Sequence, residues 1–241
     1  MNVLGIIPSR YASTRFPGKP LIDLNGKPMV RWVYEGAKEC DLFAEVIVAT
    51  DDERILNAVE VFGGKAMMTS ENHPNGTSRC AEIAKAFPDM DIVINIQGDE
   101  PLVNPKQLEQ LIQLFRNEEV KIATLAKKGL SPEEVENPNR VKVVLDNNSD
   151  ALYFSRSKIP FPFDQNSTWD YLKHIGLYGF QRSVLLDLSR LTPSTLMELE
   201  SLEQLNWLYH GYKIRVGITE IETPNIDTPE DIEKVLEWMK R

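Results

Sequence analysis

The sequence predicts an α/β fold in which a parallel sheet carries helices on both faces. Short apolar runs alternate with segments of helical periodicity through the first half of the chain, which is the pattern of strand–helix–strand units. Several of these runs end in polar loops, as strands do where a parallel sheet forms a ligand site. The 241 residues suffice for one large domain or for a domain with a substantial insertion.

Each element of the first half follows from its own pattern. Residues 3–7 (VLGII) form an apolar run that predicts a buried strand stopping at Pro8. Further strands are predicted at residues 45–50, 65–69 and 91–96, and helices at 29–40, 55–62, 80–87 and 108–115. The loops at 9–19, 72–79 and 97–101 each follow a strand. We therefore expect these three loops to converge beyond the carboxyl ends of the strands.

The second half changes character. Residues 141–145 and 152–155 flank the turn-rich segment DNNSD and predict a β-hairpin. Strands are also predicted at 175–180 and 213–221, and helices at 184–191 and 198–209. Pro229, with acids in the same first turn, opens the last predicted helix.

Composition argues against several classes of function. A formal net charge of −9 disfavours broad binding to nucleic acid or to an anionic membrane, although a local basic pocket is compatible with it. No apolar run is long enough for a signal peptide or a membrane span. Cys40 and Cys80 lack metal-ligand spacing and suit a reducing compartment. We therefore expect a cytoplasmic protein without a zinc site.

The first loop carries a cluster of cations. Arg10, Arg15 and Lys19 are interspersed with hydroxyl side chains, and fixed positive charges together with loop N–H groups suit a polyphosphate. The alternative is an ordinary solvated loop. Proline follows Lys19 and no glycine run precedes it, so the loop is neither a Walker loop nor a GxGxxG fingerprint. Phosphates would therefore be held mainly by side chains.

Polar groups outside the first loop are candidates for metal and nucleotide binding. Asp99 follows an apolar strand within QGDEP, and Mg²⁺ takes one or two carboxylates with phosphate oxygens and water; the alternative is a turn acid. Asp227 precedes Thr-Pro-Glu-Asp, and on these residues alone a helix cap is favoured over a metal ligand. In NGTSR, Gly76 permits close approach of the backbone to a nucleotide, and Thr77 and Arg79 supply hydrogen-bond donors. The alternative is an ordinary turn before a helix.

These motifs together resemble the 3-deoxy-manno-octulosonate cytidylyltransferase family, also called the CMP-Kdo synthetases. Its first loop is matched by PSR at 8–10, STR at 13–15 and PGKPL at 17–21, although the family more often has Ala at position 9. The QGDEP segment matches the family fully, as does the IDTPED stretch. The resemblance covers nearly the whole chain. It implies a three-layer, Rossmann-like nucleotidyltransferase fold with a mostly parallel mixed sheet and a smaller β-hairpin subregion.

The resemblance also implies a single domain, residues 1–241. Residues 1–130 would be mainly the nucleotide-binding part, 131–212 the sugar-binding and dimerisation part, and 213–241 a returning strand and helix. A homodimer would be built partly from apolar and aromatic surface after residue 141. The alternative is that these side chains close the sugar pocket or the core; they include Tyr153, Phe154, Phe161 and Phe163.

The implied reaction joins CTP to 3-deoxy-manno-octulosonate (Kdo), giving CMP-Kdo and pyrophosphate for lipopolysaccharide biosynthesis. Mg²⁺ would be held by Asp99 and Asp227, which reverses the preference for a helix cap at Asp227. Catalytic roles would fall to Arg10, Arg15, Lys19 and Asp99. The implied nucleotide-binding set is Pro8, Ser9, Arg10, Lys19, Gly76, Thr77 and Arg79, with Asn75 and Ser78 standing where relatives have Ser and an acid.

A sugar acid needs an Arg for its carboxylate and mixed donors and acceptors for its hydroxyls. Taken singly, the later polar residues are ordinary, but ALYFSR at 151–156, the His-x-Gly-x-Tyr strand and the ExLEQL helix match the family. His174 and Tyr178 are expected on one strand face, and Glu200, Glu203 and Gln204 on one helix face. The implied sugar-binding set is Gln97, Arg156, His174, Tyr178, Glu200, Glu203 and Gln204.

Other activities stay open at this point. Activation of a sialic acid or of the 8-amino analogue of Kdo would use the same phosphate machinery. A glycosyltransferase usually carries a D-x-D motif at its strand end, which QGDEP is not. A catalytically inactive nucleotide-binding module is the non-enzymatic alternative, and the presence of Arg10, Lys19, Asp99 and Asp227 argues against it.

Overall fold

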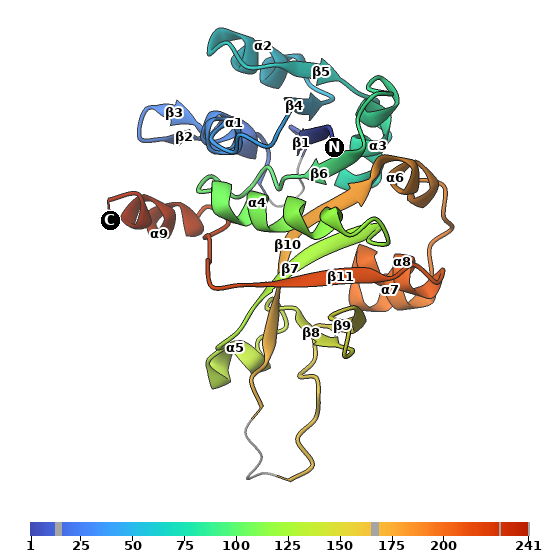
Figure 1. Cartoon of the computed structure of the whole chain (residues 1–241). Helices are drawn as coiled ribbons and strands as arrows, with labels where there is room; N and C mark the ends of the chain where they lie inside the picture. Colours follow the sequence, from blue (N-terminus) through green and yellow to red (C-terminus); the bar gives the residue numbers. More distant parts are fainter. Residues whose placement is uncertain (13–15, 165–168, 227, 241) are drawn as a thin grey trace.

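The protein is described by a computed structural model that covers residues 1–12, 16–164, 169–226 and 228–240. Its described residues form a nine-stranded sheet whose main path has the order β11-β7-β10-β6-β1-β4-β5, with β8 and β9 attached to β10 (Figure 1). Along this path the described strands run parallel except β10. The nine strands are β1 (Val3–Ser9), β4 (Glu45–Thr50), β5 (Ala66–Met68), β6 (Ile92–Asn95), β7 (Ile122–Lys127), β8 (Lys142–Leu145), β9 (Ala151–Ser155), β10 (Leu172–Gln181) and β11 (Ile214–Thr219).

Helices cover both faces of the sheet, which confirms the predicted α/β class. The longer ones are α1 (Met29–Lys38), α2 (Glu53–Val61), α3 (Gly76–Lys85), α4 (Pro105–Gln113) and α9 (Asp231–Trp238). The shorter ones are α5 (Pro132–Glu136), α6 (Arg182–Leu188), α7 (Thr195–Glu200) and α8 (Glu203–Tyr209), with 3-10 turns at Lys19–Leu21 and Leu114–Arg116; β2 (Asp23–Leu24) and β3 (Lys27–Pro28) form a small separate ribbon. No helix in the described ranges is long and apolar enough to cross a membrane.

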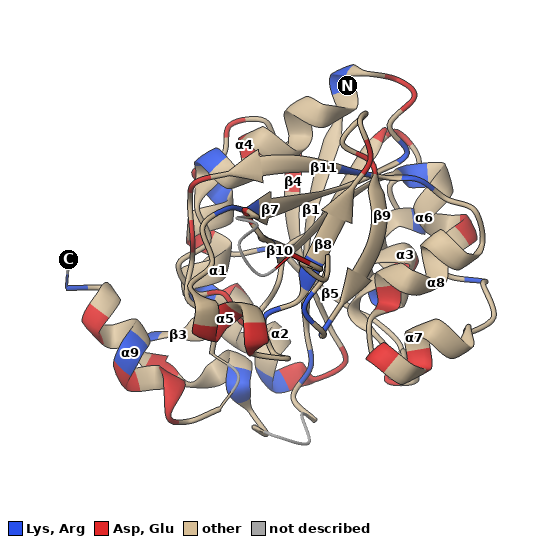
Figure 2. Ribbon diagram, turned by 90° about the horizontal axis from the view of Figure 1, so that it is seen from below, with Lys and Arg blue, Asp and Glu red and all other residues tan. Residues whose placement is uncertain are grey.

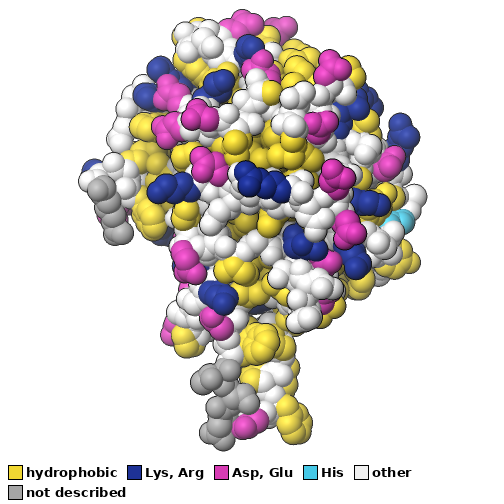
Figure 3. Space-filling view, in the orientation of Figure 1, with side chains coloured by type: hydrophobic (Ala, Val, Ile, Leu, Met, Phe, Trp, Pro, Cys, Tyr) yellow, Lys and Arg dark blue, Asp and Glu magenta, His cyan; other side chains and the backbone are white. Residues whose placement is uncertain are grey.

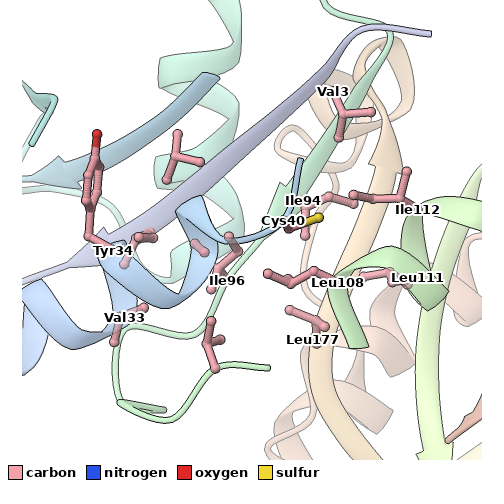
Figure 4. Close-up of a cluster of buried hydrophobic side chains, with 14 of the residues drawn as sticks. Val3, Val33, Tyr34, Cys40, Ile94, Ile96, Leu108, Leu111, Ile112 and Leu177 are labelled. Atoms are coloured by element: carbon pink, nitrogen blue, oxygen red, sulfur yellow. The ribbon is translucent and has the colours of Figure 1, made fainter. Parts of the chain in front are cut away.

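Alternate residues of β1 supply the two hydrophobic cores. Val3 and Ile7 belong to the cluster that includes α1 and α4 side chains, whereas Leu4 and Ile6 belong to the cluster with α3, α6 and α8. Figure 4 shows the first cluster, where Leu108 of α4 lies among the strand side chains. Each fully buried aliphatic side chain contributes about 1.5–3 kcal/mol. The two cores fix β1 and β6 in the middle of the molecule.

Two predicted boundaries near the strand ends are wrong. β1 continues through Pro8 to Ser9. The Ile6 carbonyl accepts from the Ile96 N–H, one residue beyond the end of β6. Pro8 faces the same side, where the pairing with β6 has already ended, so its missing N–H removes no ladder bond. Helix α3 begins at Gly76 instead of residue 80, because the Asn75 side chain accepts the Ser78 N–H at 2.8 Å and caps it.

Two features of the second half also differ from expectation. Strand β7 and the short α5 were not predicted. In β7 the run Ile-Ala-Thr-Leu-Ala is compatible with either a strand or a helix. The helix predicted over 198–209 is two helices. Ser201 adopts a left-handed conformation with φ 51° and ends α7, and Leu199, expected in the buried stripe, is 78% exposed.

Candidate active site

The three predicted loops meet at one cavity of about 230 Å³. It lies at the ends of β1 and β6 and at the start of α3. A second cavity, also about 230 Å³, shares Gln97 and Asp99 with it. The first cavity is lined by Pro8, Ser9, Arg10, Lys19, Pro20, His73, Asn75, Gly76, Arg79, Gln97, Gly98 and Asp99. The second is lined by Gln97, Asp99, Glu100, Asn139, Arg140, Val141, Lys173, His174, Ile175, Gly176, Thr223 and Asn225.

Close backbone approach around Pro8 holds the loops together. A Cβ on Gly98 would lie 2.7 Å from the Pro8 carbonyl oxygen, which excludes any other residue without movement of the backbone. A Cβ on Gly76 would lie 3.2 Å from the Pro8 ring. Ser9 is 2% exposed, and its hydroxyl has no hydrogen-bond partner in the described part of the chain. A ligand hydroxyl or phosphate oxygen would satisfy it.

Lys19 joins the first loop to the QGDEP segment. Its ammonium lies 2.9 Å from the Asp99 carboxylate and 2.7 Å from the Ile226 carbonyl oxygen. The Ile226 N–H in turn donates to the Asp99 carbonyl at 2.9 Å. The segment that ends at Ile226 is thereby fixed beside Asp99. Asp227 and Arg15, both predicted site residues, lie outside the described residues.

The Asp99 side chain has the chemistry of a hard-cation ligand. It is 30% exposed, lines both cavities and already holds one cation, the Lys19 ammonium. The described residues contain no group of three or more His, Cys, Asp or Glu suited to a metal. Mg²⁺ needs no such group, because it takes one or two carboxylates and completes its shell with phosphate oxygens and water. The residues present therefore fit Mg²⁺ bound together with a nucleotide.

Arg79 enters the first cavity from a buried position. It is 3% exposed, its guanidinium donates to Asp51 at 2.6 Å, and it also donates to the Thr69 hydroxyl. A buried charge is tolerated when it is paired and hydrogen-bonded in this way. Asp51 was not among the predicted site residues, although its place directly after the predicted strand at 45–50 was an available signal. The pair fixes the direction in which Arg79 faces the cavity.

A buried polar layer lies behind the start of α3. The Thr77 hydroxyl donates to the Glu203 carboxylate at 3.0 Å, and Thr77 is 3% exposed. Burial raises the pKa of Glu203 to about 7, against the opposing effect of the Thr77 bond. The Tyr178 hydroxyl and the Asn206 side-chain oxygen are buried without a partner within the described ranges. Glu203 is thus the ionisable group of a layer that is short of hydrogen bonds.

Glu203 should make stability depend on pH. Its folded pKa of about 7 exceeds its unfolded value of 4.5, so the folded state binds the extra proton and stability falls as pH rises through this window. We expect Glu203→Gln, which keeps an acceptor for Thr77, to match the wild type near pH 5 and to be more stable by up to about 3 kcal/mol at pH 8. Urea unfolding across this range measures the difference. Glu198→Gln, at an exposed site, is the control, and a variant whose advantage did not grow with pH would contradict the assignment.

His174 and Gln97 connect the sheet to the second cavity. The His174 ring lies 3.0 Å from the Thr124 hydroxyl, and burial lowers the pKa of His174 to about 3, so the ring is neutral. The side-chain amide of Gln97 donates to the Gly176 carbonyl at 2.8 Å, beside an irregularity in the pairing of β10. The rings of His174 and Tyr178 are 5.2 Å apart, as expected for residues on one strand face.

Arg156 and Glu200 serve the fold at the junction of β9 and α7. The Arg156 guanidinium donates to the carbonyls of Glu200 (2.6 Å), Pro138 (3.0 Å) and Ser201 (3.3 Å), and so caps the end of α7. Glu200 accepts from the Ser155 hydroxyl at 2.6 Å and from the Arg156 N–H at 2.9 Å. Because the chain turns at Ser201, the expectation that Glu200 shares a helix face with the two following polar residues is wrong. The predicted sugar residues outside the linings of both cavities are Arg156, Tyr178, Glu200, Glu203 and Gln204.

Sequence reasoning missed several residues that line the cavities. His73 lines the first cavity and pairs with Glu82, and its place beside the 75–79 motif was the available signal. Arg140 and Lys173 bring cations to the second cavity. Lys173 adjoins a predicted sugar residue, whereas Arg140 lies in a polar turn before a hairpin strand and carried no motif signal.

Known proteins resemble the chain over its whole length. The cytidylyltransferase family pattern matches residues 4–214. The 3-deoxy-manno-octulosonate cytidylyltransferase of Parabacteroides distasonis is 51% identical, over 99% of this chain and 98% of that protein. The 8-amino-3,8-dideoxy-manno-octulosonate cytidylyltransferase of Shewanella pealeana is 48% identical, over 96% of each. The solved structure of CMP:2-keto-3-deoxy-manno-octonic acid synthetase complexed with CTP matches with a TM-score of 0.95 at 45% identity, over 100% of this chain and 99% of that one.

Proposed function

The chain belongs to the 3-deoxy-manno-octulosonate cytidylyltransferase family, and from this membership we propose that it transfers CMP from CTP to Kdo. The anomeric hydroxyl oxygen of the sugar bonds to the α-phosphorus of CTP. The bond from that phosphorus to the bridging oxygen of the β-phosphate breaks, and the hydroxyl proton passes to solvent. The products are CMP-Kdo and pyrophosphate.

The observation that carries this proposal is the pair of adjoining cavities with Asp99 between them. A transfer between two substrates requires both to be held with the reacting atoms within about 3–3.5 Å. The first cavity joins the cationic loop to the start of α3, and the second adjoins it at Gln97 and Asp99. One cavity therefore suits the nucleotide, and the other suits the sugar.

Nucleotide binding follows from the cations and donors of the first cavity. Arg10 is exposed at the end of β1. The Lys19 ammonium, which now pairs with Asp99, can bind a phosphate instead. The free N–H groups at the start of α3 are a favourable site for an anion. Arg79, held by Asp51, supplies a further fixed positive charge. These groups neutralise the triphosphate, which is most of what this transfer asks of a protein.

Mg²⁺ is the proposed cofactor, and Asp99 would hold it. When bound at such a carboxylate, the ion neutralises phosphate charge and lowers the pKa of the attacking hydroxyl. The ion pair of Asp99 with Lys19 supports this proposal, because it places a positive charge at the carboxylate. In the described part of the chain no side chain of the cavities stands out as a general base, since burial lowers the pKa of His174 to about 3 and makes its ring too weak a base to hold a proton near neutral pH.

Sugar binding is supported by polar groups on β10 and beside it. The buried hydroxyl of Tyr178 has none among the described residues, and leaving it so costs about 1–3 kcal/mol. His174 and Gln97 line the second cavity with donors and acceptors suited to sugar hydroxyls. We propose that the sugar lies against β10, where these three residues are close to one another.

We also propose a homodimer formed through the arm between β9 and β10. This arm projects from the body in Figure 1, and Figure 3 shows hydrophobic side chains along it. Phe161, Phe163 and Trp169 are 73%, 95% and 58% exposed, more than a monomer ordinarily leaves in one place. A second copy is the partner that the family resemblance implies.

The dimer predicts a mass in solution of twice 27.5 kDa. Phe163→Ser should shift the sedimentation profile toward monomer, because it removes apolar surface from the interface without touching a core. Val61→Ser, at a site that is 88% exposed on α2, is the matched control. A wild-type protein that sediments as a monomer at micromolar concentration would rule out the dimer.

The experiment that tests the activity is a pyrophosphate-release assay with CTP, a panel of sugar acids, and Mg²⁺ present or omitted. Release with Kdo that requires Mg²⁺ is the expected result. Release only with sialic acid would replace the sugar assignment. Binding of CTP without release for any sugar acid would instead support a catalytically inactive nucleotide-binding module.

A further inference from the structure

Arg140 places a cation without a partner in the second cavity. Its guanidinium has no hydrogen bond or ion pair with any part of the chain that the structure describes. This contrasts with Arg156, the arginine that the sequence suggested for the sugar, whose guanidinium is occupied by three backbone carbonyls. Arg140 is therefore the arginine of this region whose donors are available to a substrate.

The backbone around Arg140 is held in place. The Arg140 N–H donates to the Asn137 carbonyl at 3.0 Å, and the next carbonyl, of Val141, accepts from His174 at 2.9 Å. The fully buried Lys142 donates to the Asn137 and Arg156 carbonyls at 3.0 and 2.6 Å. The turn is thus tied to β10 and to the end of β9. The fixed backbone keeps the Arg140 side chain within reach of the second cavity.

The charged side chains that line the second cavity are Asp99, Glu100, Arg140 and Lys173, and of these only Arg140 has no side-chain partner among the described residues. Asp99 is paired with Lys19, and Glu100 accepts from the Thr223 hydroxyl at 3.1 Å. Glu222 receives both Lys127, at 2.9 Å, and Lys173. Burial would raise the pKa of Glu222, but these two ammonium groups lower it to about 2. Asp99, Glu100 and Lys173 are thus all partnered, and the guanidinium of Arg140 is the charged group of the lining that remains available to a substrate.

We propose that Arg140 makes this cavity selective for the acidic sugar Kdo over its 8-amino analogue, a proposal that rests on the proposed function. Kdo carries one negative charge, whereas the analogue also carries an ammonium group and is neutral overall. The unpaired guanidinium of Arg140 attracts the first sugar, whereas its attraction to the carboxylate of the second is offset by repulsion from the ammonium group. The attraction by Arg140 is local, because α5, α7 and α9 carry several acidic residues on the outside (Figure 2).

The test compares kcat/KM for the two sugars at saturating CTP and Mg²⁺. We expect the wild type to favour Kdo by at least about tenfold. Arg140→Gln should lower kcat/KM for Kdo by about 10- to 100-fold, because the attraction between two unit charges is lost, and change the value for the 8-amino sugar by less than about threefold, because attraction and repulsion are lost together. Arg140→Lys, which keeps the charge, should retain most of the preference. The KM for CTP should not change.

Arg116→Gln is the matched control, because this exposed arginine lies outside both cavities. Equal losses for both sugars in Arg140→Gln, with unchanged Tm, would overturn the proposal, as would a wild type that prefers the 8-amino sugar. Absence of pyrophosphate release by the wild type with every sugar acid would overturn the proposed function itself and this proposal with it. A preference for Kdo that persists in Arg140→Gln would leave the activity intact and reject the role of Arg140.

Discussion

Replacing Asp99 by Asn is expected to lower kcat by about 10²- to 10³-fold while changing Tm little. Asp99 is the described carboxylate that lines both cavities, so its charge acts where the phosphoryl group passes from one to the other. Loss of one preorganised electrostatic group at a reacting centre has effects of this size. The folded state loses only an ion pair with Lys19, whose partners are 15% and 30% exposed, and such a pair contributes about 1 kcal/mol or less.

Pyrophosphate release as a function of Mg²⁺ concentration, together with a thermal unfolding scan, measures both effects. Asp41→Asn, at an exposed position away from the cavities, should behave as the wild type. Near-normal kinetics with an unchanged Mg²⁺ dependence in Asp99→Asn would show that the metal and phosphate chemistry lies elsewhere. A large loss of Tm would show that Asp99 is mainly a structural residue.

Replacing Lys19 by Met should lower kcat/KM for CTP by about 10²-fold and at the same time strengthen divalent-metal binding to the nucleotide-free protein. The first effect follows because the ammonium is a fixed positive charge of the first cavity. The second follows because the same ammonium lies 2.9 Å from Asp99 and competes with any other cation for that carboxylate. In the wild type, nucleotide phosphates would attract Lys19 and leave the carboxylate to the metal.

Titration with Mn²⁺, followed by its electron paramagnetic resonance signal without CTP, separates these two effects. Lys19→Met should bind the ion more tightly than the wild type, although the variant has lost activity. Lys38→Met, on the exposed face of α1, should change neither quantity. Equal Mn²⁺ affinity in Lys19→Met and the wild type would mean that the Lys19 ammonium does not compete with the metal ion for Asp99.

The parts of the fold that the sequence predicted are those set by apolar periodicity. The strands at β1, β4, β6 and β11 are continuous apolar or alternating runs, and their places in the chain were clear. Strand β7 was missed because its two alanines and leucine suit a helix equally well, and what makes it a strand is its pairing with β10 and β11. Non-local pairing of this kind leaves no local signature.

The candidate site was predictable to the extent that it depends on where strands end. Pro8, Gly76 and Asp99 were placed together because the carboxyl ends of parallel strands share one edge. The partners of individual side chains were not predictable. Arg156 was expected at the sugar, yet the left-handed turn at Ser201 presents backbone carbonyls that occupy its donors. Arg140 was passed over because a short-range pattern does not show which side chains stay without a partner.

The position of β10 has a consequence for how the chain is assembled. This strand lies between β6 and β7, although it is synthesised after both of them. Until residues 172–181 leave the ribosome, the facing edges of β6 and β7 lack their neighbour, and exposed strand edges can pair with other chains. The segment between β7 and β10, which contains the hairpin and the arm, must form a closed loop when β10 pairs. Each extra residue in that loop adds little to its entropy cost, but pairing between residues so far apart in the sequence slows folding. An N-terminal fragment of 130 residues would therefore lack the neighbours of β7 on both edges and of β6 on one.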